Sequence, residues 1–398
     1  MIPRTLETAL RRHVATFPAI LLTGPRQSGK TTLATATFPH YRYISLEDLQ
    51  NRDEATSDPR GFLRRLEGEP GVILDEIQRT PDLMAYLQGF LDQRRAGPVI
   101  LTGSEQLLMS QHVSQTLAGR VAVLELLPFS LAELARRPAF DPERLADAAA
   151  VPHDPPIASL DEILFQGLFP PIHDRAPDPS LWLDGYIRTY IERDVRAVSS
   201  VGDLDAFTRF VALCAGRAGQ LLNLSALGSE AGVTHTTARR WLSILRAGYL
   251  VDTIQPHFAN FSRRLVKTPK LYFTDTGLLC RLLGIRRPAD IHLHPLRGAI
   301  VENLVYCELR KVFLHHGQRA PLFFWRDGHG REVDFLVDYG TWRLPVEVKA
   351  GETLASDALK GLDFYADLSG GPGGLLVWGG SESYARGRHH VRSWWACS

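Results

Sequence analysis

A glycine-bounded octapeptide near the start of the chain carries residue types that suit phosphate binding. Residues 24–31, GPRQSGKT, fit the spacing G-x-x-x-x-G-K-S/T without a mismatch. Glycines let the main chain fold tightly, so that amide N–H groups point at phosphate oxygens. Lys30 would reach the β- and γ-phosphates of ATP, and the Thr31 hydroxyl would contact Mg²⁺. The residues expected to bind ATP are Gly24, Pro25, Arg26, Gln27, Ser28, Gly29, Lys30, Thr31 and Thr32.

Two acidic residues close the second apolar run of this region. Asp75 and Glu76 follow Val72-Ile73-Leu74, as in a Walker B strand. Asp75 would hold the Mg²⁺ shell, and Glu76 would orient or polarise the attacking water. The second acid favours hydrolysis over nucleotide binding alone.

Two further residues follow or precede apolar runs at positions where they could contact the γ-phosphate. Of the polar residues in Thr102-Gly103-Ser104, Ser104 is the expected sensor of that phosphate. Arg120 would reach the γ-phosphate of a neighbouring subunit, as an arginine finger does. The alternatives are an ordinary turn at a strand end and a surface arginine.

A second group of acids lies near the end of the chain, on two short apolar strands. Glu347 and Lys349 are two residues apart and so point to the same side of a strand, and Asp334 lies on the preceding strand. We expect Asp334 and Glu347 to bind Mg²⁺ and Lys349 to position or activate water for attack on a phosphodiester. Glu302, on the helix before, would complete the metal shell, with Glu308 as the alternate. A surface ion pair that contributes little is the other interpretation.

The middle of the chain combines a helical pattern with basic residues. Residues 234–247 predict a recognition helix, and a wing would precede the strand that begins at residue 270. The inward residues would be Ala238, Trp241, Leu242 and Leu245; the outward ones His235, Arg239, Arg240 and Arg246; and those of the wing Arg263, Arg264, Lys267 and Lys270. Such a pattern suits phosphate contacts, so DNA is the expected partner. Winged helices also serve as protein-interaction modules or as lids on ATPase cores, and these roles stay open.

The elements that would position these residues alternate in type. Strands are expected at 19–24, 71–76, 98–104 and 121–126, and helices at 82–95 and 105–117. This alternation implies a parallel sheet covered on both faces. Further helices are expected at 179–199, at 299–314 and from 351 onward, and strands at 321–326, 332–337, 344–350 and 375–379.

Composition narrows the class of protein. The chain has 398 residues, 45 of them basic and 44 acidic, so nucleic-acid binding would need a local patch. No apolar run approaches the roughly 18 residues that span a bilayer, and the first residues lack the apolar centre of a signal peptide. The four cysteines are scattered without a CxxC pair. We therefore expect a cytoplasmic protein with reduced thiols and no membrane partner.

The motifs in combination resemble a known family. The stretches LLTGPRQSGKTTL, LDEIQ, LTGS and LAGR followed by LPFSLAEL resemble the AAA+ superfamily and, within it, the family AAA_14. YIERDV (190–195) and YFTDTG (272–277) resemble signatures of its partner domain DUF4143, and the Asp, then Glu-x-Lys, pattern resembles PD-(D/E)XK nucleases. This resemblance implies an ATPase core, a winged-helix segment and a nuclease-like carboxyl-terminal module.

We therefore expect an α/β protein in which a P-loop AAA+ core precedes a helical, winged-helix domain and an α/β nuclease-like domain. The expected segments are a core at 1–137, a linker at 138–157, the helical and winged-helix domain at 158–284 and the nuclease-like domain at 285–398. The predicted function is ATP hydrolysis with Mg²⁺, coupled to a Mg²⁺-dependent nuclease-like module acting on DNA. The alternative is an ATP-dependent switch that binds DNA or a protein and cuts nothing. A homo-oligomer, as a ring or of lower order, is also expected.

Overall fold

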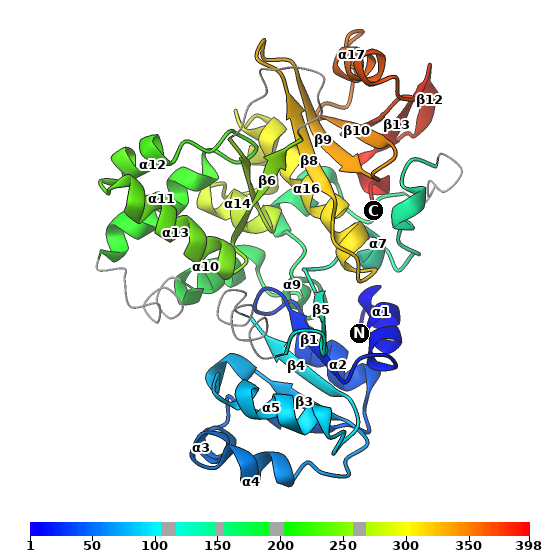
Figure 1. Ribbon diagram of the computed structural model, residues 1–398. Coiled ribbons are helices and arrows are strands. Elements are labelled where there is room, and N and C mark those ends of the chain that lie inside the picture. Colours follow the sequence, from blue (N-terminus) through cyan, green and yellow to red (C-terminus); the bar gives the residue numbers. More distant parts are fainter. Residues whose placement is uncertain (105–116, 148–154, 191–202, 258–267) are drawn as a thin grey trace.

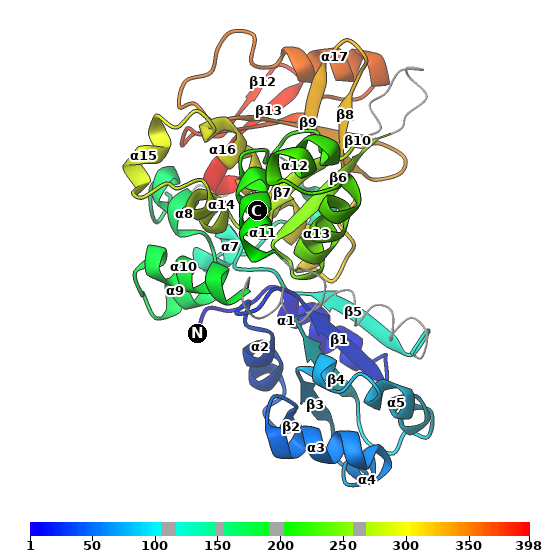
Figure 2. The ribbon, with the colours of Figure 1, turned by 90° about the vertical axis from the view of Figure 1, so that its left-hand side faces the viewer.

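The computed structural model describes residues 1–104, 117–147, 155–190, 203–257 and 268–398. Most of the helix expected at 105–117 and the second half of the one expected at 179–199 lie outside these residues. So do Arg263, Arg264 and Lys267 of the expected wing. The described chain forms two lobes, with residues 1–125 in the lower one in Figures 1 and 2.

The lower lobe is built on a parallel sheet, as the sequence predicts, but the sheet has a fifth strand, Arg42–Ser45, that was not predicted. Its strands are β1 (Ala19–Thr23), β2 (Arg42–Ser45), β3 (Val72–Asp75), β4 (Val99–Gly103) and β5 (Val121–Glu125). Their order is β2-β3-β4-β1-β5, and each neighbouring pair is parallel. Because the strands are parallel, the residues that follow β1, β3 and β4 meet at one edge of the sheet. The phosphate loop, the Asp75–Glu76 pair and the residues after β4 meet at that edge.

Helices cover both faces of this sheet. The helices are α1 (Leu6–Val14), α2 (Lys30–Thr37), α3 (Leu49–Ser57), α4 (Pro59–Arg64) and α5 (Leu83–Asp92), with a 3₁₀ turn at Ile77–Arg79. Ile20 and Leu22 pack with α1 and α2 on one face, whereas Leu21 packs with α4 and α5 on the other. This alternation along β1 explains why its residues form an unbroken apolar run.

An eight-stranded mixed sheet organises the upper lobe. Its strands are β6 (Val251–Pro256), β7 (Lys270–Phe273), β8 (Leu322–Arg326), β9 (Glu332–Asp338), β10 (Arg343–Lys349), β11 (Leu375–Trp378), β12 (Tyr384–Arg386) and β13 (His389–Ser393). Their order is β12-β13-β11-β10-β9-β8-β6-β7. One face packs on α16 (Arg297–Leu314) and the other on α17 (Lys360–Ser369). β6 and β7, which the sequence places in the middle segment, thus complete the carboxyl-terminal sheet.

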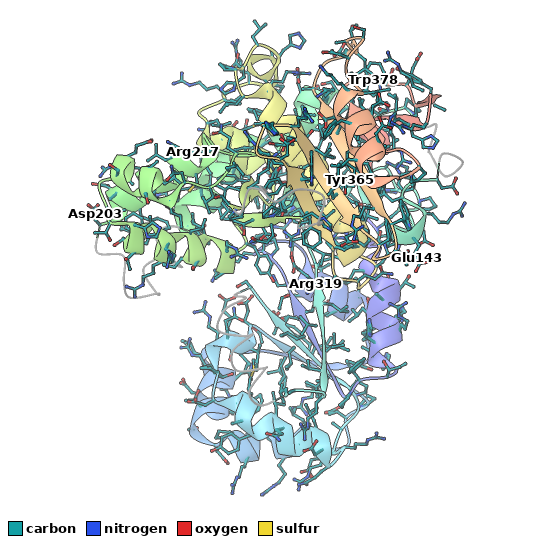
Figure 3. The ribbon with its side chains drawn as sticks, turned by 45° about the horizontal axis from the view of Figure 1, so that its top comes forward. Glu143, Asp203, Arg217, Arg319, Tyr365 and Trp378 are labelled. Atoms are coloured by element: carbon teal, nitrogen blue, oxygen red, sulfur yellow. The ribbon has the colours of Figure 1, made fainter. Side chains whose placement is uncertain are left out.

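The other described helices belong to the upper lobe, and α8 and α14 contact α16. These other helices are α7 (Leu131–Leu134), α8 (Leu160–Gln166), α9 (Pro170–Asp174), α10 (Pro179–Thr189), α11 (Leu204–Ala215), α12 (Leu224–Ala231), α13 (His235–Ala247), α14 (Thr276–Leu282) and α15 (Pro288–His292). Arg217, which pairs with Glu230 across α11 and α12, marks this helical part in Figure 3, and Tyr365 marks α17. The segment expected to be a linker has a 3₁₀ turn at Pro142–Arg144 and contributes Phe140 and Leu145 to the same hydrophobic core.

The helix expected from residue 351 onward begins only at Lys360. Residues 351–359 form bends and turns instead, and Ala358 and Leu359 are buried beneath α17. The packing of these apolar side chains beneath α17 therefore determines the backbone of this segment, and the helix expected from the sequence does not form there. A further short 3₁₀ turn lies at Trp394–Ala396. Among the described residues, no helix is both long and apolar enough to span a bilayer.

Candidate nucleotide site and carboxyl-terminal acidic cluster

The predicted phosphate loop joins β1 to α2 in the conformation that its glycines require. Gly24 has φ +143°, and a Cβ there would lie 2.1 Å from the carbonyl oxygen of Leu126. Gly29, with φ +92°, directly precedes α2. Ser28 is fully buried, and its hydroxyl has no partner. A tight loop with an unpaired hydroxyl at a helix start fits an anionic ligand.

Lys30 closes this loop from within. Its ammonium donates hydrogen bonds to the carbonyl oxygens of Gly24 (2.9 Å) and Pro25 (2.8 Å). Burial lowers the pKa of Lys30 to about 8, although Glu76 and Asp75 act in the opposite direction. The lysine thus lacks a carboxylate in direct contact, and a phosphate would supply the missing negative charge.

Asp75, at the end of β3, is the centre of a second set of contacts. Its Oδ1 accepts a hydrogen bond from Thr31 Oγ1 at 2.8 Å and another from the hydroxyl of Thr102, and its Oδ2 accepts one from Tyr43 at 2.9 Å. A hydroxyl and a carboxylate in contact are suitable groups to bind Mg²⁺, directly or through its water ligands, beside a phosphate. Thr102, rather than Ser104, lies at this carboxylate.

Glu76 has a strained backbone, with φ +58°, which is rare for a residue with a Cβ. Its amide donates to Thr102 Oγ1 at 3.3 Å, and its carboxylate accepts from Gln78 Nε2 at 2.5 Å. Gln78 also donates to Ser104 Oγ at 3.2 Å. Ser104 is therefore linked to Glu76 only through Gln78. No pattern in the sequence indicates Gln78 as a site residue. Strain held in place by neighbouring contacts is typical of functional positions.

A cavity of about 490 Å³ opens beside these residues. The predicted residues that line it are Arg26, Gln27, Gly29, Lys30, Thr31, Thr32, Asp75 and Glu76. Its opposite wall comes from Ile2, Pro3 and Arg4 and from α9, including Pro171 and the exposed Arg175 that follows. The upper lobe thus contributes to the wall of the candidate nucleotide site. No sequence motif indicates this wall, because α9 lies more than a hundred residues from the phosphate loop.

Arg4 connects the phosphate loop to the upper lobe. Its guanidinium donates to the carbonyl oxygens of Ser28 (2.7 Å) and Leu127 (2.6 Å) and pairs with Glu133 at 3.2 Å. Glu133 also pairs with His315, just after α16, at 3.3 Å. Burial raises the pKa of Glu133, but the charges of Arg4 and His315 outweigh that effect and hold the pKa well below its usual range.

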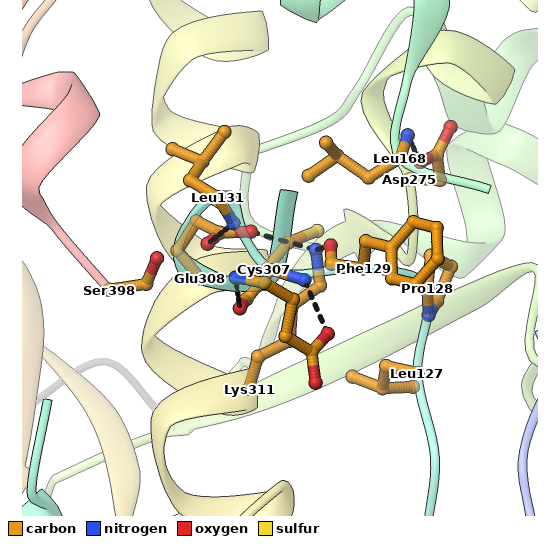
Figure 4. Close-up of polar contacts among 12 residues, drawn as sticks. Leu127, Pro128, Phe129, Leu131, Leu168, Asp275, Cys307, Glu308, Lys311 and Ser398 are labelled. Atoms are coloured by element: carbon orange, nitrogen blue, oxygen red, sulfur yellow. Dashed lines mark hydrogen bonds and ion pairs between the residues drawn. The ribbon is translucent and has the colours of Figure 1, made fainter. Parts of the chain in front are cut away.

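A second buried junction lies next to this one. Lys311 of α16 donates to the carbonyl oxygen of Phe129 and pairs with Glu308, both at 2.8 Å. Glu308 in turn accepts from the amide of Leu131 at 2.8 Å (Figure 4). Glu308 is the alternate ligand expected for the metal site. It lies at this junction instead, away from the other carboxyl-terminal acids.

Arg120 lies away from the phosphate loop of its own chain. Its carbonyl oxygen accepts from the amide of Ala19, the first residue of β1, so it lies at the opposite edge of the sheet. Its guanidinium makes a two-bond ion pair with Asp92 (2.5 and 3.0 Å) on the surface. Arg120 could therefore contact a nucleotide only in another subunit.

The carboxyl-terminal acids lie near one another, but they do not converge as expected. Glu347 pairs with Lys349 at 2.7 Å, while its Oε2 is buried without a partner. Burial and the charge of Asp334 raise the pKa of both Glu302 and Glu347 to about 7. Asp334 itself accepts a hydrogen bond from the amide of Val348 at 2.8 Å. The three acids therefore share one electrostatic environment.

Lys270 lies within this acidic cluster, although the sequence analysis places it on an exposed wing. It is 2% exposed, pairs with Glu302 at 3.1 Å and also pairs closely with Glu332. Tyr272 donates to the same oxygen of Glu302 at 2.5 Å. The error has a simple cause: β7 is the last strand of the carboxyl-terminal sheet, so its side chains face α16 rather than solvent.

As arranged, these acids do not fit a single metal ion. Among the described residues, no three His, Cys, Asp or Glu side chains are grouped so that they could hold one. Glu302 projects from α16 on one face of the sheet, whereas Glu347 Oε2 lies 3.4 Å from where a Cβ of Gly361, on α17, would be. The Lys270 ammonium already pairs with the carboxylate of Glu302. The predicted ligands thus lie near one another, but they do not surround one empty position where a metal ion could bind.

The predicted recognition helix is α13, and Thr234 caps it. Ala238, Trp241, Leu242 and Leu245 are buried as expected, together with Ile244. His235, Arg239, Arg240 and Arg246 are exposed. The helices α11, α12 and α13 are followed by the antiparallel pair β6 and β7, and Leu221 bridges to Lys270. The winged helix expected from the sequence stays a prediction.

Comparisons with known proteins agree with the motifs. A model of an AAA domain, AAA_14, matches residues 16–135, and models of domains of unknown function, DUF8612 and DUF4143, match residues 157–289 and 297–397. The uncharacterized protein Rv2008c of Mycobacterium tuberculosis is 31% identical over 356 residues, which are 88% of this chain and 74% of that protein. Mb2031c of Mycobacterium bovis matches equally. The chain belongs to the AAA_14/DUF4143 family of ATPases.

Solved structures of ATPases also resemble this AAA_14 chain. The Walker-type ATPase PABY2304 of Pyrococcus abyssi has a TM-score of 0.46 at 16% identity and covers 71% of this chain and 96% of its own. The RuvB Holliday junction branch migration motor of Thermotoga maritima has a TM-score of 0.30 at 19% identity, covering 62% and 85%. The AAA_14 chain is an ATPase with a P-loop core.

The lowered pKa of Lys30 gives a testable pH dependence. The charged lysine attracts phosphate, and it is already charged in the free AAA_14 protein below about pH 8. Above that pH, binding must also protonate the lysine, so the affinity for ATP should fall by up to about tenfold per pH unit. Isothermal titration between about pH 6.5 and about pH 9.5 measures this effect. The variant Lys30→Arg should give a flat profile, because guanidinium stays charged; a wild-type profile that is equally flat would contradict the prediction.

Proposed function

We propose that this ATPase binds ATP with Mg²⁺ in the cavity beside the phosphate loop and that hydrolysis repositions the upper lobe. One observation carries the proposal. The Thr31 hydroxyl and the Asp75 carboxylate meet at 2.8 Å beside a lysine that lacks a carboxylate in contact. When bound, Mg²⁺ would shield the charge of the β- and γ-phosphate oxygens.

Each residue of the chain has a distinct part in this proposal. The Lys30 ammonium would leave the two loop carbonyl oxygens and bind the phosphates. Thr31 and Asp75 would hold the metal and its water shell. Glu76, fixed by Gln78 and by its amide contact with Thr102, would orient the attacking water and accept its proton. Ser104 would act on the γ-phosphate through Gln78.

The coupling to the upper lobe would run through Arg4 and α9. Both line the cavity, and Arg4 also holds the Ser28 carbonyl oxygen and Glu133. A phosphate loop that opens around a nucleotide would disturb these contacts. Movement of α9 and α16 relative to the core would follow.

Replacement of Glu76 tests hydrolysis separately from binding. Glu76→Gln removes the proton acceptor but leaves Lys30, Thr31 and Asp75 in place. We expect phosphate release to fall by about 10²–10⁴-fold while ATP affinity stays within a few-fold of wild type. A phosphate-release assay and isothermal titration measure the two effects. Glu67→Gln, a surface change in the same lobe, is the control; near-normal hydrolysis by Glu76→Gln would contradict the assigned role.

We also propose that subunits associate so that Arg120 of one contacts the γ-phosphate of another. Its place at the sheet edge opposite its own phosphate loop and its exposed pairing with Asp92 support this role. Removal of an arginine finger costs about 10³–10⁵-fold in rate.

A mixing experiment tests the arrangement. Arg120→Ala and Glu76→Gln should each be inactive alone, but their mixture should recover part of the hydrolysis, because some sites then combine an intact Glu76 with a neighbour's intact Arg120. Asp92→Asn in place of Arg120→Ala is the control, since it frees the arginine without removing it. No recovery in a mixture shown by light scattering to be oligomeric would contradict the proposal.

A second candidate function is DNA binding and cutting by the upper lobe. The exposed His235, Arg239 and Arg240 on α13 favour DNA binding, together with Arg263, Arg264 and Lys267, which lie outside the described residues. The buried, unpartnered Glu347 Oε2 beside Asp334 and Lys349 favours a reactive site. The alternative is a switch that binds DNA or a protein and cuts neither.

Incubation with nucleic acid separates these functions. Plasmid and linear DNA are incubated with Mg²⁺ or Mn²⁺, with and without ATP, and examined for breaks. The nuclease proposal expects cutting that Asp334→Asn abolishes and that Glu352→Gln, an exposed change in the same module, leaves intact. If wild type leaves all DNA uncut under these conditions, the switch is the better description.

A further inference from the structure

The buried Lys270 is the one lysine that links two acids of the upper lobe in the described chain. Its ammonium lies 3.1 Å from Glu302 Oε1, in direct contact with Glu332 and 5.6 Å from the centre of the Phe324 ring. Burial lowers the pKa of Lys270, but the charges of Glu302, Asp334 and Glu332 outweigh it and raise the pKa above its usual value. The lysine is therefore held as a cation.

The backbone around Lys270 fixes this position. Leu221 forms a bridge to Lys270, and Gly219 donates to the carbonyl oxygen of Leu271 at 2.7 Å. β7 also pairs with β6, so its main chain is held on both sides. The ammonium therefore belongs to the architecture of the cluster and is not a loose surface charge.

The charges in the cluster explain why a cation is needed there. Glu302, Asp334 and Glu332 lie around one ammonium, and buried acids without a counter-charge are costly. A divalent cation would neutralise the same oxygens, but Glu302 Oε1 already accepts from both Lys270 and Tyr272. Two cations cannot occupy this space together, because they would repel each other at close range.

We propose that the Lys270 ammonium and a divalent cation exclude each other at the Glu302–Asp334 cluster, so that this lysine keeps the module free of metal. The inference rests on the proposed carboxyl-terminal site. It adds that any metal-dependent cutting requires Lys270 to leave first. β7 contacts α14 and α16, and Leu221, between α11 and α12, bridges to Lys270, so movement of these elements is a means of withdrawing it.

Metal binding, rather than DNA cutting, tests this exclusion. All proteins carry Asp75→Asn, which removes the acid of the nucleotide site, and Mn²⁺ binding is followed by electron paramagnetic resonance without nucleotide. Lys270→Gln should bind one Mn²⁺ at least about tenfold more tightly than the parent. Asp334→Asn added to it should abolish that gain. Lys270→Arg, which keeps the charge, and Lys360→Gln, which removes an exposed lysine nearby, should match the parent.

Each result decides the proposal. Equal Mn²⁺ affinity in Lys270→Gln and the parent overturns it, as does tight binding by the parent that Asp334→Asn abolishes. If Lys270→Gln is unfolded by circular dichroism, Mn²⁺ should restore its fold, and failure of Mn²⁺ to do so also overturns it. Absence of DNA cutting would remove the nuclease proposal but leave the exclusion standing, since metal occupancy is measured directly.

Discussion

The guanidinium of Arg4 is the contact on which the relation between the two lobes depends. It is almost fully buried, so its charge must be matched within the protein. Glu133 supplies the opposite charge, and the Ser28 and Leu127 carbonyl oxygens accept hydrogen bonds from its two terminal nitrogens. Removing one partner of such a pair costs about 3–5 kcal/mol. The phosphate loop and the start of the upper lobe are thereby fixed to the same side chain.

From Glu133 the constraint continues to α16. His315 pairs with Glu133, Lys311 holds the Phe129 carbonyl oxygen, and Arg310 pairs with Glu125 at the end of β5 at 2.7 Å. α16 is also the helix that carries Glu302. A rearrangement of the phosphate loop and the state of the acidic cluster are therefore connected through one rigid helix and a few buried ion pairs.

The two functional regions contain buried lysines in opposite electrostatic situations. Lys30 has only carbonyl oxygens in contact, and burial lowers its pKa, so the site favours an added anion. Lys270 has more acids around it than it can neutralise, and its pKa is raised, so the site is already supplied with a cation. The same residue type thus prepares one lobe for a phosphate and closes the other to a metal.

The sequence by itself determined the parallel ATPase sheet, the phosphate loop and the Asp75–Glu76 strand end, because these depend on local patterns: glycines at tight turns, apolar runs and acids that end them. It also predicted four of the five buried residues of α13, all except Ile244. Tertiary structure decided the rest. Gln78 reaches Glu76 only through the turn after β3, Thr102 rather than Ser104 lies at Asp75, and Arg4 and α9 reach the cavity from distant parts of the chain. Lys270 lies in the acidic cluster because β7 joins a sheet in which all strands except β6 and β7 come later in the sequence. Long-range pairing leaves no spacing along the chain from which such neighbours could be derived.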